Sequence, residues 1–198
     1  MKLFVCLFLT CASLFAAPLT KVMLINAGDP PMTDGKDYVG PYTLQLPGGD
    51  VPALCIDLAD EAQVGEQWTA FVSPLEGSLA DTYHPEQRVA YEEEAYLYSL
   101  ITEPGGDRTD LQHAAWSLTD SAYGPDASAE RWISQAQRDY ETIDFKKFVV
   151  VSEAPGDTGS RSQEFIAVSP VAEPAWINLM AGLTAIGLAL IGRKRGCF

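Results

Sequence analysis

The sequence predicts a mixed α+β fold: one compact domain of β-strands with about three helices, between a signal peptide and a C-terminal transmembrane helix. Three observations support this prediction. A chain of 198 residues has room for one ordinary domain and short terminal segments, but not for two large domains. Apolar blocks stand at both ends of the chain. Between them, strand-like alternation comes first, helical periodicity follows, and strand-like stretches return.

The first predicted strands form a hairpin. Residues 38–46 alternate between apolar and polar side chains, and the Pro-Gly-Gly-Asp sequence at 47–50 provides a turn. Residues 51–58 are the expected partner strand, and residues 67–72 form a third strand. This arrangement places Cys55, within the sequence Leu-Cys-Ile-Asp, on a predicted strand.

Three helices are predicted next. The first covers residues 85–101, where the glutamates at 92–94 are expected to lie mostly in solvent. Its inward face should comprise Val89, Tyr96, Leu97, Leu100 and Ile101. The second helix begins near Thr109 or Asp110, either of which is a suitable N-cap, and Ser128 is expected to cap the third. Two late strands are predicted at 145–151 and 164–168.

The N-terminal residues 1–16 have the layout of a secretory signal peptide. A single Lys precedes an apolar run too short to span a bilayer, and small residues follow it. Cleavage is expected between Ala16 and Ala17, which makes signal peptidase a processing partner. A lipidated Cys11 and a buried N-terminal strand are the two alternatives.

Residues 170–198 form a second targeting segment. Glu173 and Pro174 precede an uncharged stretch at 175–192, which in a helix spans about 25 Å, just enough for a thin hydrocarbon core. The tail at 193–198 carries a basic cluster that should remain cytoplasmic and leave the domain outside. This cluster is Arg193, Lys194 and Arg195.

The order of Glu-Pro, short apolar helix and basic cluster resembles the PEP-CTERM sorting signal of Gram-negative bacteria. The sequence departs from that signal at Ala172, where the family usually has Pro. The resemblance implies recognition by an exosortase and removal of the tail near Glu173 and Pro174. The protein would then be anchored transiently in the inner membrane before it reaches the cell surface or extracellular matrix. A permanent single-pass anchor is the alternative.

The composition argues against several functional classes. A net charge of −14 repels nucleic acid, so no nucleic-acid partner is expected. The chain contains only two histidines, His84 and His113, and no paired-cysteine spacing, so neither a metal site nor another cofactor is predicted. Nucleophile-elbow and phosphate-loop motifs are also missing, and we do not expect an enzyme.

Two short motifs in the predicted domain, residues 17–169, carry a second resemblance. Cys55 is the only cysteine between the two processing sites, and Gln112 stands in Leu-Gln-x-Ala-x-Trp on the second helix. The two motifs resemble the thioester (TQXA) domains of bacterial surface adhesins, over roughly residues 38–120. Leu54, Leu111 and Ala115 depart from that family's pattern.

The resemblance implies that Cys55 and Gln112 lie side by side and form a thioester, an acyl group that amines or hydroxyls can attack. The target would be a surface or polysaccharide bearing such groups. Asp57, two residues along the strand, could orient the site. His113 could assist acyl transfer, although one helical step turns it about 100° from Gln112. Trp116 is expected in the core. The alternative is a non-reactive matrix or envelope protein in which Cys55 is simply a core residue.

Overall fold

The computed structural model describes residues 17, 19–28, 31–102, 107–120, 123–156 and 162–169. The predicted signal peptide at 1–16 and the sorting segment at 170–198 therefore lie outside the described residues, apart from Ala17 at the expected cleavage site. Within the described ranges, no helix has both the length and the apolar character needed to cross a bilayer.

Six antiparallel strands close into a barrel in the order β1-β4-β5-β8-β7-β6. The barrel strands are β1 (Leu19–Asn26), β4 (Tyr42–Leu46), β5 (Gly49–Cys55), β6 (Gln67–Pro74), β7 (Phe148–Glu153) and β8 (Phe165–Val168). A separate hairpin pairs β2 (Met32–Thr33) with β3 (Tyr38–Val39). The mixed α+β class that the sequence predicted is thus confirmed, and the barrel closure is an additional finding.

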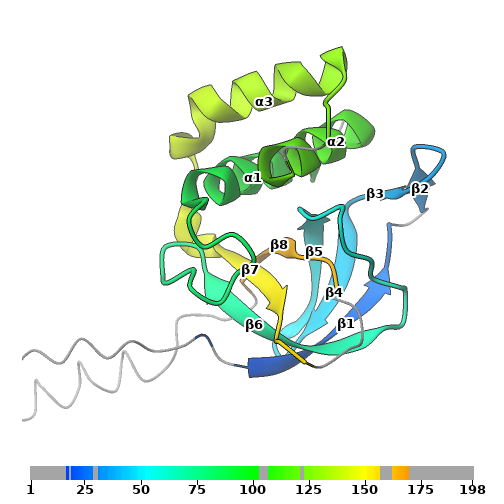
Figure 1. The fold of residues 1–198 in the computed structure, drawn as a ribbon, viewed down its shortest axis with the longest axis vertical. Helices are drawn as coiled ribbons and strands as arrows, with labels where there is room; N and C mark the ends of the chain where they lie inside the picture. Colours follow the sequence, from blue (N-terminus) through cyan, green and yellow to red (C-terminus); the bar gives the residue numbers. More distant parts are fainter. Residues whose placement is uncertain are drawn as a thin grey trace, which may run out of the picture.

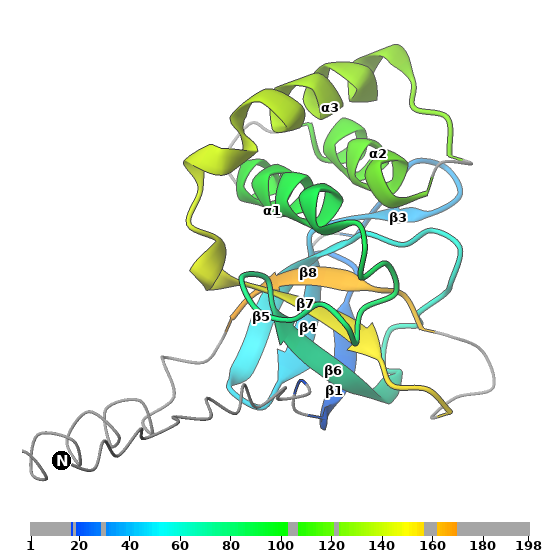
Figure 2. The same ribbon diagram turned by 60° about the vertical axis from the view of Figure 1, so that its left-hand side comes forward.

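Three helices form a layer over one side of the barrel (Figures 1 and 2). They are α1 (Arg88–Ile101), α2 (Arg108–Thr119) and α3 (Ala127–Asp139), followed by the short 3-10 helices η1 (Tyr140–Thr142) and η2 (Phe145–Lys147). Helix α1 contacts β8, and α2 contacts both β5 and β3. The β2–β3 hairpin therefore stands beside α2 rather than within the barrel.

Strand β5 separates two hydrophobic cores. Ala53 and Cys55 point into the barrel, where they pack with Trp68 and Phe165. Leu54 and the following Ile56 face the helices. This alternation follows from the two-residue period of a strand, and it places the sulfur of Cys55 inside the barrel core.

Several element boundaries differ from the predicted ones. The expected strand at 38–46 is divided into β3 and β4 at Gly40 and Pro41, because proline has no N–H for the ladder. The strand expected from residue 145 begins at Phe148, after the turn of η2. Strand β1 was not predicted.

The N-caps of two helices also differ from the prediction. The side chain of Asp107 caps α2 by accepting from the Asp110 amide, and Asp126 caps α3 by accepting from the amides of Ser128 and Ala129. The predicted caps, Thr109 or Asp110 and Ser128, therefore lie inside the helices, at least two residues after the observed N-caps. Asp and Ser are both good caps, so sequence alone did not distinguish them.

Two predictions for α1 are wrong. Val89, expected on the buried face, is 51% exposed. Glu94, expected in solvent, is fully buried, and Glu93 is 7% exposed. The reason is that α1 contacts α2, α3 and β8 at once, so more than one stripe of the helix is covered.

Candidate functional site

Helix α2 is tied to the end of β5 by three side chains spaced at i, i+4 and i+7. Gln112 Nε2 donates to the Cys55 carbonyl at 2.5 Å, and Trp116 Nε1 donates to Cys55 Sγ at 3.5 Å. Thr119 Oγ1 donates to the carbonyl of Ile56 at 2.5 Å. Because residues at this spacing share one helix face, the whole face is directed at the strand end. The structure thus brings Cys55 and Gln112 into contact across 57 positions of sequence.

The side-chain amide of Gln112 is held at both ends. Its Oε1 accepts from the backbone N–H of Gly40 at 3.2 Å, while its Nε2 donates a hydrogen bond to the Cys55 carbonyl. The residue is fully buried. A Cβ at position 40 would lie 3.1 Å from that oxygen, closer than an ordinary contact. Glycine therefore permits the close approach of the backbone to Gln112.

The thiol of Cys55 is fully buried and has two polar contacts. Sγ donates to the backbone carbonyl of Asp57 at 3.1 Å and accepts from the indole of Trp116. Burial raises the pKa of Cys55 to about 12, although the hydrogen bond from the Trp116 indole favours the thiolate. The resting group is thus the neutral thiol.

Asp57 lies just beyond the end of β5 and is 8% exposed. Its Oδ1 accepts from the amide of Ala59 at 2.8 Å, and its Oδ2 is buried without a partner among the described residues. The prediction that Asp57 stands at the site agrees with its position. Its backbone carbonyl, however, is the group that contacts the sulfur.

His113 faces away from Cys55. Its Nε2 lies 3.0 Å from Asp34 Oδ2, and its ring stacks on Trp116 with centroids 5.7 Å apart. Tyr123 meets both rings edge-on, also at 5.7 Å. The sequence predicted that His113 turns from Gln112 but missed its partner Asp34. The Asp-Gly sequence at 34–35, typical of a turn, was the available signal.

Trp116 is buried, as expected, but the sequence did not indicate that its indole reaches the sulfur. It also lines a cleft of about 410 Å³ between the β2–β3 hairpin and the loop that follows β5. The other lining residues that matter below are Lys36, Asp37, Tyr38, Tyr42, Glu61 and Val64.

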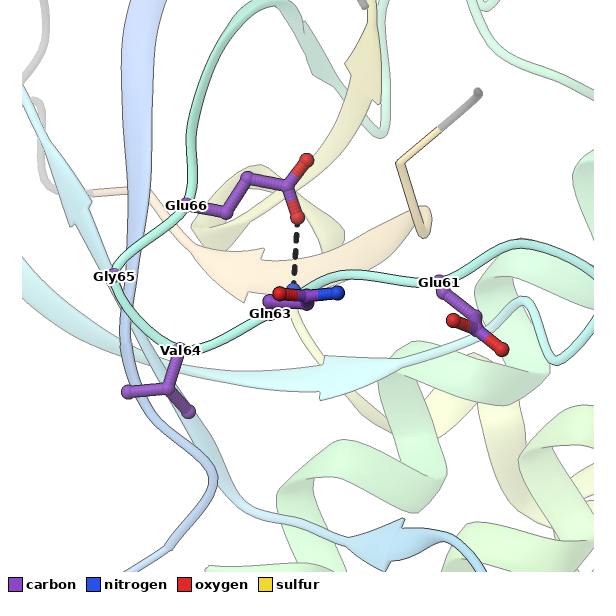
Figure 3. Close-up of a pocket in the computed structure, with 5 residues that line it drawn as sticks. All are labelled: Glu61, Gln63, Val64, Gly65 and Glu66. Atoms are coloured by element: carbon purple, nitrogen blue, oxygen red, sulfur yellow. Dashed lines mark hydrogen bonds between the residues drawn. The ribbon is translucent and has the colours of Figure 1, made fainter. Parts of the chain in front are cut away.

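A second, more open hollow of about 510 Å³ lies along the same loop (Figure 3). Glu61, Gln63 and Val64 line both hollows, so the two are neighbours. Figure 3 shows Gln63, whose backbone N–H donates to Glu66 Oε2 at 2.8 Å and closes this turn of the loop.

Two buried carboxyl groups, Glu94 within α1 and Glu164 just before β8, are further features that the sequence did not predict. Glu164 accepts from the Tyr83 amide at 2.9 Å, from Tyr91 Oη at 2.7 Å and from Ser152. Neither carboxyl oxygen of Glu94 has a hydrogen-bond partner of ordinary geometry among the described residues. Burial, and then the charge of Glu164, raise the pKa of Glu94 well above its usual value.

The processing residues are mostly outside the described part of the chain. Ala17 is described, and its backbone N–H donates to Asp81 Oδ2 at 3.0 Å. Ala16 and the sorting residues Glu173, Pro174, Arg193, Lys194 and Arg195 are not among the described residues. In the described ranges, no three His, Cys, Asp or Glu side chains are grouped so that they could hold a metal ion.

Comparison with known proteins gives no relative: no family model, curated protein or solved structure matches this chain. The geometry around Cys55 and Gln112 therefore has to support any functional conclusion.

Proposed function

We propose that the protein is an exported surface or matrix module, sorted by an exosortase, in which Cys55 and Gln112 form a thioester for covalent adhesion. The observation that supports this best is the buried amide of Gln112, held between the Gly40 N–H and the Cys55 carbonyl. Glycine at position 40 leaves room for this arrangement, because a Cβ there would lie 3.1 Å from the Gln112 oxygen.

The proposed reaction needs no cofactor. The sulfur of Cys55 attacks the side-chain carbonyl carbon of Gln112, the carbon–nitrogen bond breaks, and the thiol proton leaves with the nitrogen as ammonia. The Gly40 N–H lies where it would stabilise negative charge on Oε1 during the attack. The Trp116 indole favours the thiolate. Burial of both groups then keeps water from the product.

The surroundings of the site favour a cationic target. The cleft beside Trp116 carries the carboxylates of Asp37 and Glu61 as well as the phenol of Tyr38, and Lys36 is its one basic residue among those described. Carboxylates and aromatic faces attract ammonium groups. An amine-bearing surface is therefore the expected partner, ahead of a hydroxyl-bearing polysaccharide.

The alternative is a non-reactive matrix or envelope protein with the same fold. Two observations favour it. The pKa of the Cys55 thiol is about 12, and the Gln112 side-chain nitrogen donates a hydrogen bond to the Cys55 carbonyl, which gives the glutamine a structural role. In this case Gln112 is a buried link between α2 and β5, and Cys55 is a core residue.

The intact mass of the exported protein, purified without reductant, distinguishes the two functions. With a thioester, the mass falls by one ammonia, Cys55 resists alkylation even after the protein is unfolded in urea, and methylamine adds one methylamide at Gln112. Cys55→Ala and Gln112→Glu should each abolish the ammonia loss while the fold is retained. The full mass together with a Cys55 that is alkylated in the unfolded protein would favour the non-reactive protein.

Sorting requires a separate experiment in a host with an exosortase. Replacing Glu173 and Pro174 with alanine should retain a longer form in the membrane, because the proposed recognition sequence is lost. Fractionation and immunoblotting measure the size and location of the product. Equal size and location for both forms would contradict the sorting proposal.

A further inference from the structure

Trp116 is shared by the cleft and the buried sulfur. Its side chain is 1% exposed and lines the cleft, and its indole nitrogen bonds to Cys55 Sγ. Cys55 itself does not line the cleft. A reagent in the cleft therefore meets Trp116 before it meets residue 55.

Two aromatic rings hold Trp116 in place. His113 stacks on its ring at an interplanar angle of 26°, and Tyr123 packs edge-on at 74°. His113 is itself fixed by the 3.0 Å contact between its Nε2 and Asp34 Oδ2. The side chains of His113 and Asp34 are only 14% and 18% exposed, so this contact is better shielded from water than one between surface side chains.

The second carboxylate oxygen of Asp34 accepts hydrogen bonds from the backbone at the rim of the cleft. Oδ1 accepts from the backbone amides of Lys36 and Asp37, each at 2.9 Å, and both of these residues line the cleft. One carboxylate thus connects the turn of the β2–β3 hairpin to α2. Helix α2 also contacts β3, and its Gln112 accepts from the Gly40 N–H, so Asp34 adds a side-chain link at the turn of a hairpin that already packs against the helix.

We propose that Asp34 and His113 are positioning residues that hold Trp116 closed over residue 55, and that the cleft is the route by which reagents reach it. The inference goes beyond the proposed function, because it concerns access to position 55 whether that position is a thiol or a thioester. Neither residue touches the sulfur in the structure. Both act through the indole of Trp116.

The test is the rate at which Cys55 reacts in the full-length protein, with peptide mapping to separate Cys55 from the other cysteines. Iodoacetamide probes a free thiol, and methylamine probes a thioester, so the same variants serve in both cases. Asp34→Asn removes the carboxylate that His113 contacts. His113→Phe keeps an aromatic ring on Trp116 but removes Nε2.

We expect each variant to raise the rate about fivefold, as for the loss of one hydrogen bond. Asp37→Asn is the matched control, since Asp37 belongs to the same turn but pairs with Lys36. Its rate with iodoacetamide, which is uncharged, should stay near that of the wild type, and its rate with methylamine, which is mostly protonated at neutral pH, should not exceed it. A wild-type rate in either Asp34→Asn or His113→Phe would overturn the proposal.

Global destabilisation is excluded with Ile133→Ala, which removes a partly buried side chain in α3. The free energy of unfolding is measured for every variant by urea denaturation. If Ile133→Ala raises the Cys55 rate as much as Asp34→Asn does at equal loss of stability, access occurs by unfolding and the proposal fails.

Charged probes test the route itself. In Asp34→Asn, a methanethiosulfonate with an ammonium group should modify a free Cys55 faster than one with a sulfonate. For a thioester, ethylenediamine should react faster than glycine. Glu61→Gln should reduce either ratio because it removes a carboxylate from the cleft wall. A ratio that Glu61→Gln leaves unchanged would show that reagents do not pass through the cleft.

Discussion

Gly40 determines how closely the backbone can approach the amide of Gln112. Its N–H donates a hydrogen bond to Gln112 Oε1. Because glycine has no Cβ, the oxygen can lie this close to the backbone. The sequence motifs indicated that Cys55 and Gln112 belong together, but they did not indicate this third residue. The close approach depends on the break between β3 and β4, which local alternation could not reveal.

Gly40→Ala should therefore disturb the site directly. The new Cβ would lie 3.1 Å from Gln112 Oε1 and 3.3 Å from the Tyr42 ring, so one of them must move. We expect a loss of about 1–3 kcal/mol in the free energy of unfolding and, if the thioester forms, a lower fraction of protein that has lost ammonia. Urea denaturation and intact mass measure the two effects.

Gly124→Ala is the matched control, because a Cβ there meets nothing within 4 Å. Its stability should be close to that of the wild type. Equal effects of the two substitutions would mean that the contact with Gln112 does not constrain position 40.

At the scale of elements, α2 illustrates which features a sequence can predict. Its position after three predicted strands and a helix followed from periodicity, and its tryptophan was correctly expected in the core. The helical repeat also predicts that Gln112, Trp116 and Thr119 share one face of the helix. That this face meets the end of β5, rather than another strand, depends on barrel closure, a long-range property that no local pattern contains.

Helix α1 shows the opposite case. A single-stripe interpretation of its sequence placed Glu94 in solvent, because a charged triplet is usually exposed. The tertiary structure covers this helix from three elements and buries Glu94 completely. The error arose because the number of covered faces is decided by neighbouring elements and cannot be derived from the helix itself.

For the whole molecule, the buried carboxyls make stability depend on pH. Burial raises the pKa of Glu94 and of Glu164, and hydrogen bonds from Ser152, Tyr91 and Tyr83 partly oppose the shift at Glu164. Both groups therefore hold their protons in the native state at pH values where the unfolded chain has lost them. Their contribution is fully present below about pH 4.5, the unfolded value, and is lost as the pH rises through the native pKa.

Glu94→Gln should remove one of these two protons from the balance without changing the shape of the side chain. As the pH rises from about 4.5 through the native pKa of Glu94, the free energy of unfolding of the wild type should fall with pH more steeply than that of the variant, by at most about 1.4 kcal/mol per pH unit. As the pH rises, the variant should become more stable relative to the wild type. To fold at high pH, the wild type must either bury a charged Glu94 or take up a proton, and the variant does neither. Urea denaturation across this range provides the measurement, with Glu86→Gln, an exposed glutamate before α1, as the control. Parallel curves for the wild type and Glu94→Gln would mean that Glu94 titrates as it does in the unfolded chain, and that water reaches it in the native protein.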